Sequence, residues 1–311
     1  MTVTASPPAP PRRRRKSGAP TTAVLFDVPG PRARRRNALI GVVGSIVIAA
    51  ALAYVVYRFW KTGQFSGQKW EILEYKQPQL TILEGFLNTL KAAGIAAVLA
   101  LALGIGLASA RISDHAWLRV PSFWFVELFR AVPLVLLMFL FYYGTPSLGL
   151  RVSPLWAVVL GLTLYNGSVF AELFRAGIAS VPRGQSEAAY ALGLRKTQVM
   201  TSVLVPQAVR AMLPAIISQL VVLLKDTALG FLVTYDELLK QLKQLATAQQ
   251  FEYPLIPLVI VGGVIYVTTC LLLSWFATWL ERRLSRKSTR TAAPTMEGDP
   301  GQQMGGGAAV I

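Results

Sequence analysis

The chain has 311 residues, of which 53% are hydrophobic and 15% are charged, and its formal net charge is +16. An apolar fraction this high with so few charges indicates a membrane protein rather than a pair of soluble domains. The single cysteine, Cys270, and the single histidine, His115, exclude a disulfide framework, a multi-cysteine metal site and a catalytic triad. We therefore expect no catalytic residue, no metal ion and no cofactor bound by this chain.

Six long apolar stretches are predicted to cross a membrane, because each has about the 20 residues that a helix needs to span a bilayer core. The first follows a polar leader and is longer than the apolar core of a signal peptide, so it predicts a retained anchor. The pattern as a whole predicts an all-α polytopic membrane protein. The expected spans are residues 38–60, 85–110, 120–144, 154–175, 211–233 and 254–280.

The positions of Lys and Arg set the expected orientation. With the N-terminus inside, the cytoplasmic segments hold 21 of the 31 basic residues and the external segments hold seven. Positive charge is retained on the cytoplasmic side, so we expect a multi-pass protein of the cell membrane with both termini in the cytoplasm. The basicity is then mostly a sign of topology, and the cluster Arg32 to Arg36 can also touch anionic membrane lipid.

The two ends of the chain have the composition of disordered segments. Residues 1–36 are rich in Pro and Arg, and residues 281–311 include a run of three glycines. Neither has enough apolar surface to fold. We expect a disordered cytoplasmic leader before the anchor at residues 38–60 and a disordered cytoplasmic tail after the last span.

Nucleotide-binding motifs are absent from the sequence. There is no G-x-x-x-x-G-K-[ST] phosphate loop and no G-x-G-x-x-G that opens a helix after a strand. Without a backbone cradle for phosphates the chain is not expected to hydrolyse ATP. Any ATP-driven work must therefore come from a partner.

The loop at residues 176–210 is far longer than a connection between membrane helices needs. Ser186 is a possible N-cap, good helix formers follow it, and Gly193 is placed as a helix terminator. A second short helix is expected at residues 197–205, and Pro214 is expected to begin the next membrane helix. Two short helices that meet at a glycine predict a compact knob.

This loop resembles the E-A-A coupling loop of bacterial ABC importer permeases. The resemblance covers residues 85–280 and implies the type I permease fold, with five core helices in that permease domain and one extra N-terminal helix. Further motifs narrow it to permeases for polar amino acids. The loop motif is Glu187 to Gly193 followed by Leu204 to Ala208, and the narrowing motifs are Glu127 to Leu134, Tyr165 to Ser168, Glu172 to Gly177 and Leu224 to Leu229.

The N-terminal helix and the lead-in at residues 28–32 are most similar to the permeases of actinobacterial glutamate importers. The resemblance implies import of a polar amino acid, with glutamate as the best guess. It also implies four partners: cytosolic ATPase subunits that bind the ATP, a second permease subunit, an extracellular substrate-binding protein and the membrane lipid. No nucleic acid is expected among them.

In the family the loop docks into a groove on the ATPase. The resemblance therefore implies that the coupling surface is formed by Glu187, Ala188, Ala189, Gly193 and Arg195, with Lys196 at its rim. The residue types suit this role, because small alanines let the knob seat closely and a glutamate can accept hydrogen bonds from a partner arginine. A surface turn without a partner is the alternative.

Charged residues inside a membrane span are costly and by default mark a pathway or a buried partner. Lys225 and Asp226 suit the carboxylate and the ammonium group of an amino acid, so we expect them on the substrate path together with Asn166. An interhelical salt bridge that holds the bundle is an equally good interpretation of Lys225 and Asp226.

Two further pairs of opposite charge lie three residues apart on predicted helices. They are Glu127 with Arg130, next to a kink at Pro133, and Glu172 with Arg175. Pairing within a helix lowers the cost of burying both charges. We expect these four residues to support the intramembrane structure rather than to contact substrate.

Two other functions compete with an importer permease. An autonomous ion-coupled secondary carrier would need a self-contained ion site and usually a duplicated set of helices, and neither is visible in the sequence. A membrane-anchored scaffold would use the basic leader to bind nucleic acid or lipid.

Overall fold

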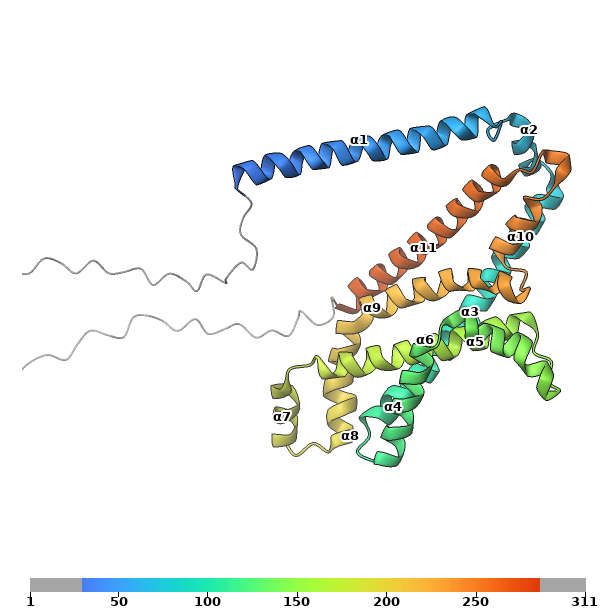
Figure 1. Ribbon diagram of the computed structural model, residues 1–311. Helices are drawn as coiled ribbons and strands as arrows, with labels where there is room; N and C mark the ends of the chain where they lie inside the picture. Colours follow the sequence, from blue (N-terminus) through green and yellow to red (C-terminus); the bar gives the residue numbers. More distant parts are fainter. Residues whose placement is uncertain (1–29, 286–311) are drawn as a thin grey trace, which may run out of the picture. The chain divides into compact units, whose positions relative to one another are not determined.

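The computed structural model describes residues 30–285, and all regular secondary structure in that range is helical. The predicted all-α class is confirmed. The chain divides into two units, residues 1–63 and 64–311. The disorder expected for residues 1–29 and 286–311 lies outside the described residues (Figure 1).

The first unit contains one long helix, α1, from Pro31 to Lys61, with no buried residue. The predicted leader of residues 1–36 is therefore wrong from Pro31 onward, where the chain is already helical. The reason is local: Pro31 stands in the first turn, where the fixed φ of proline suits a helix, and the arginines that follow it are good helix formers.

In the second unit, α3 (Lys76–Ile112) and α6 (Pro154–Ala179) pack closely against each other. Glycines permit the close approach, since a Cβ on Gly104 would lie 2.6 Å from the Cβ of Phe170 and a Cβ on Gly167 would lie 2.8 Å from Leu103. Buried alanines of α3, including Ala96 and Ala100, complete this core.

The expected third span at residues 120–144 is wrong as a single helix. Helix α4 (Ala116–Ala131) and helix α5 (Leu134–Phe139) are bent by 100° at the break between them. Pro133 lies in the break, where it lacks the N–H that a continuing helix needs. A π-helical turn at Leu140–Gly144 and a 3-10 turn at Thr145–Leu148 follow α5.

The expected fifth span at residues 211–233 begins too late. A continuous helical segment runs from Lys196 to Val233, through α8 (Lys196–Gln198), a π-helical stretch (Val199–Leu204), α9 (Val205–Asp226) and a 3-10 stretch (Thr227–Val233). Pro214 lies inside α9 rather than at its start, so the second short helix of the expected knob is the beginning of this span.

The last two α-helices of the described range are α10 (Leu238–Leu245) and α11 (Leu255–Ser285), and a 3-10 turn at Gln249–Phe251 lies between them. The expected tail from residue 281 is therefore helical as far as Ser285, since α11 continues without a break. Within residues 30–285, five helices are long and apolar enough to cross a membrane, or six if α4 and α5 count as one span.

Candidate functional site

The knob between α6 and the fifth span is built by α7 (Arg183–Ala191), which lies between the end of α6 and α8 in Figure 1. The helix begins after Pro182, three residues before the predicted N-cap. Ser186 lies inside the helix, where its hydroxyl donates to the Arg183 carbonyl oxygen at 2.7 Å. The N-cap prediction is therefore wrong, because that hydroxyl bonds within the helix rather than at its start.

Gly193 ends α7 in the left-handed conformation, with φ +78°. Its N–H donates to the Tyr190 carbonyl, and the Leu194 N–H donates to the Ala189 carbonyl. These bonds are those of a glycine-terminated helix. A Cβ on Gly193 would meet no atom within 4 Å, so this position needs glycine for its backbone conformation and not for packing.

The predicted coupling residues differ in what they can offer to a partner. Glu187 and Ala188 are exposed on α7, whereas Ala189 is buried. Leu192 is 82% exposed beside Gly193, so the tip of the knob presents an apolar side chain next to the small residues. Arg195 precedes α8, and its backbone N–H donates to Gln198.

Lys196 pairs with Asp114, in the connection between α3 and α4. The expected rim residue of the coupling surface is thus tied to the membrane bundle. The Lys196 ammonium holds the pKa of the Asp114 carboxyl below its usual range, first by a hydrogen bond and then by its charge.

The four residues expected to support the intramembrane structure lie in one ion network. Arg175 Nη2 is 2.5 Å from Glu172 Oε1, and Arg130 Nη1 is 3.7 Å from Glu127 Oε1. Arg111 joins the two pairs, at 2.7 Å from Glu172 and 4.0 Å from Glu127. The network connects the end of α3 to α4 and α6.

Arg111 was not predicted to take part, because the expected second span ends at residue 110. A signal for the network was present, because residues 127–131 and 172–176 both read Glu-Leu-Phe-Arg-Ala. The two pentapeptides each contain an ion pair, and Arg111, whose side chain is only 8% exposed, bridges their carboxylates.

The three expected path residues are not brought together. Within residues 30–285 no hydrogen bond or ion pair links Lys225 to Asp226 or to Asn166. Lys225 is exposed in a groove of about 460 Å³ between α9 and α11, beside Ser218, Ser274 and Thr278. Asp226 is half-buried at the last residue of α9.

Asn166 is fully buried on α6, and both ends of its amide are used. Its Nδ2 donates to the Leu162 carbonyl at 3.0 Å, and its Oδ1 accepts from Gln219 of α9 at 2.8 Å. This geometry favours a bond that holds α6 to α9 over direct contact with substrate.

A second feature that the sequence did not reveal is Glu237, which is fully buried before α10. Its carboxylate accepts from the backbone N–H groups of Leu239 and Lys240, both at 2.7 Å, and from the Tyr266 hydroxyl of α11 at 3.0 Å. Burial raises the pKa of Glu237, and these hydrogen bonds oppose the rise. The residue therefore caps α10 and fastens it to α11.

Within the described range, no cluster of three or more His, Cys, Asp or Glu side chains could hold a metal ion. The geometry offers instead a projecting knob, an ion network beneath it and a groove with a lysine.

Comparison with known proteins gives the family. The profile of the binding-protein-dependent transport system inner membrane components matches residues 74–286. The chain belongs to this family. The match begins two residues before α3 and runs one residue past the end of α11 as described.

Two curated relatives are amino-acid permeases. The glutamate transport system permease protein GluD of Corynebacterium glutamicum is 46% identical over 185 residues, which are 57% of this chain and 67% of the relative. The arginine transport system permease protein ArtQ of Bacillus subtilis is 36% identical over 210 residues, covering 67% of this chain and 94% of the relative. The chain is thus an ABC importer permease for amino acids.

Solved structures confirm the fold. A crystal structure of an amino acid ABC transporter with histidines aligns over 68% of this chain and 98% of its own, with a TM-score of 0.63 and 27% identity. An inward-facing structure of the methionine transporter MetNI aligns with a TM-score of 0.56 at 20% identity, over 68% of this chain and 99% of its own. The expected type I permease fold is therefore the fold of this permease.

Proposed function

We propose that this permease carries glutamate through the cell membrane as one subunit of an ATP-driven importer. The observation that carries the proposal is the 46% identity over 185 residues to a permease named for glutamate transport. The groove around Lys225 agrees with an acidic substrate, because an exposed ammonium group can bind a carboxylate.

The knob is the coupling surface for a separate ATPase. Glu187, Ala188 and Leu192 are exposed on one compact unit that is tied to α3 through Lys196. A push on this unit is transmitted to the fifth span, because Lys196 is the first residue of the same continuous helical segment that contains Lys225. The permease itself then needs no nucleotide site.

The remaining partners follow from this role. A second permease subunit completes the pathway around Lys225, and an extracellular binding protein delivers glutamate. Both termini lie in the cytoplasm, on the same side as the knob, since most basic residues outside the spans lie there in this orientation.

Uptake of labelled glutamate into proteoliposomes tests the proposal. The permease is purified with its ATPase, second permease and binding protein, and uptake is measured with ATP and with a non-hydrolysable analogue. We expect uptake only with ATP, competed by aspartate more strongly than by glutamine or arginine. Uptake by the permease alone under an ion gradient would establish the secondary carrier instead.

Substitution of Lys225 tests the substrate path. Lys225→Gln is expected to raise the KM for glutamate by about tenfold, because the substrate loses one charge-assisted hydrogen bond. The maximal rate should change less. Lys76→Gln, at the exposed start of α3, is the matched control and should leave KM unchanged. An unchanged KM for Lys225→Gln would favour the structural interpretation of this residue.

A further inference from the structure

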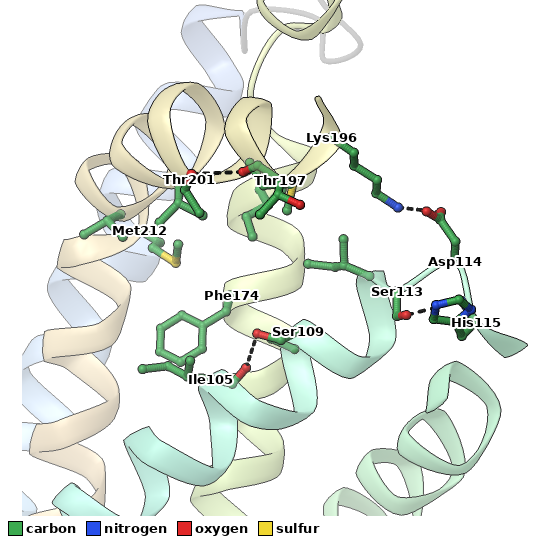
Figure 2. Close-up of a pocket in the computed structure, with 16 residues that line it drawn as sticks. Ile105, Ser109, Ser113, Asp114, His115, Phe174, Lys196, Thr197, Thr201 and Met212 are labelled. Carbon is green, nitrogen blue, oxygen red and sulfur yellow. Dashed lines mark hydrogen bonds and ion pairs between the residues drawn. The ribbon is translucent and has the colours of Figure 1, made fainter. Parts of the chain in front are cut away.

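A pocket of about 600 Å³ lies between the end of α3, the end of α6 and the beginning of the fifth span (Figure 2). Its volume is that of a typical small-molecule site. Phe174 and Met212 project into it from α6 and α9, and Ile105 and Ala108 line it from α3. The pocket is separate from the groove that contains Lys225.

Two of the four hydroxyl groups in the pocket wall already donate within their own helix. Ser109 donates to the Ile105 carbonyl at 2.8 Å, and Thr201 donates to the Thr197 carbonyl at 2.9 Å, as the dashed lines of Figure 2 show. A serine or threonine that bonds its own helix offers no donor to a ligand. The interior of the pocket therefore suits an apolar chain.

One rim of the pocket is charged. Lys196 and Asp114 form an ion pair there, and His115 lies beside them. The Lys196 side chain is 44% exposed, so its ammonium group stays open to an anionic head group. A ligand with an anionic head and an apolar chain matches both parts of the site.

The pocket also meets the membrane-facing side of the bundle. Ile105 in its wall is 57% exposed, and Val98, two turns earlier on α3, is 67% exposed. Exposed apolar side chains on a spanning helix face the acyl chains of the bilayer. An acyl chain can therefore enter the pocket sideways without crossing water.

From these observations we infer that the pocket binds an anionic membrane phospholipid, with one acyl chain between α3, α6 and α9 and the phosphate at Lys196. Burial of the chain gains little, because bilayer chains are already in an apolar medium. Selection must come from the head group, so the site distinguishes anionic from zwitterionic lipid. Because Lys196 to Thr201 form one wall, the bound lipid holds the start of the fifth span against α3.

Thiol protection measures occupancy of the pocket. The full chain carries Cys270→Ala and Ser109→Cys, and it is placed in nanodiscs of phosphatidylcholine with or without phosphatidylglycerol. We expect phosphatidylglycerol to slow maleimide labelling by about fivefold, because one Lys charge strengthens binding to an anionic membrane surface by about this factor. The matched control is Ser202→Cys, which is exposed on the same wall segment but outside the pocket lining, and its rate should be unaffected.

Two charge variants separate lipid binding from a purely structural ion pair. Lys196→Gln should abolish the protection by phosphatidylglycerol, because it leaves Asp114 unpaired at the rim. Asp114→Asn should preserve or increase it, because it frees the ammonium group. A structural ion pair would make the two variants alike, and that result would overturn the inference.

A steric variant tests the location of the acyl chain. Ile105→Trp fills the pocket from an exposed position and should remove the lipid dependence, whereas Val98→Trp on the same helix face should keep it. Equal protection in phosphatidylcholine and phosphatidylglycerol would overturn the inference. So would a loss of protection on deletion of residues 286–311, which would identify the occupant as the chain's own C-terminal segment.

Discussion

Gly193 sets the direction in which the chain leaves α7, because its φ of +78° is accessible to glycine at little cost. Its place after a run of helix formers predicts a helix end, and the structure confirms that Gly193 ends α7. What the sequence could not reveal is that the space around the missing side chain is open. The constraint at this position is conformational.

Gly193→Asp is expected to abolish glutamate uptake while folded protein stays in the membrane. A side chain raises the free energy of this left-handed conformation by about 1 kcal/mol. This cost changes the direction of the knob, and it is too small to unfold the helical bundle. Gly184→Asp, also with open space around it but with no positive φ, is the control and should transport normally. Uptake and detergent-resistant folding are measured on the same membranes, and normal uptake by Gly193→Asp would contradict the coupling role.

Arg111 illustrates a residue whose importance depends on tertiary contacts. Arg111→Gln leaves Glu172 and Glu127 short of a buried cation, and we expect a loss of stability of about 3 kcal/mol. Thermal unfolding of the purified permease measures the loss. Arg119→Gln, at an exposed arginine, should change stability by no more than about 0.5 kcal/mol. Adding Glu172→Gln to Arg111→Gln should restore part of the loss, and a further decrease would show that the network is not the cause.

Glu237 predicts a pH dependence with a definite sign. A carboxyl whose pKa is raised on folding stabilises the folded state fully below its ordinary pKa of 4.5, and this contribution is lost as pH rises through the folded value. The melting temperature of the wild type relative to Glu237→Gln should therefore be higher at pH 5 than at pH 8. A larger wild-type advantage at pH 8 would show that the ionised carboxylate is the stabilising form.

At the scale of elements, the contact between α3 and α6 depends on glycines that face the neighbouring helix. Gly104 meets the Cβ of Phe170, whereas Gly94 on the same helix has nothing within 4 Å. Helical periodicity alone does not distinguish these two residues. The difference arises only when the helices are packed.

Gly104→Ala is expected to destabilise the permease by about 1–3 kcal/mol, since the added methyl group forces the helices apart. Gly94→Ala should be neutral or slightly stabilising, because alanine is the better helix former. Thermal unfolding of the two variants side by side measures the difference. Equal melting temperatures would show that α3 and α6 can separate without cost.

At the scale of the whole molecule, the two units differ in the residues that they bury and in the transport features that they contain. Helix α1 buries no residue, whereas the second unit contains the knob, the ion network, the groove around Lys225 and the pocket of Figure 2. All features that we assign to transport lie in the second unit. The family profile likewise begins at residue 74.

Deletion of residues 1–30 is expected to leave the rate of glutamate uptake within about twofold of the full chain, because the removed charges influence topology more than transport. Uptake is normalised to the amount of permease in the membrane. Loss of uptake at normal abundance would favour the scaffold function, in which the basic leader binds a partner.

The sequence by itself determined the all-α class, most of the spans and the glycine that ends α7. Their signals are local, since run length, composition and turn residues act on neighbouring positions. The structure alone decided that the kink at Pro133 is a break bent by 100°, that Arg111 joins two identical pentapeptides, and that Asn166 is used in packing. These features depend on which distant residues meet, and that is set by how the helices pack rather than by any short stretch of chain.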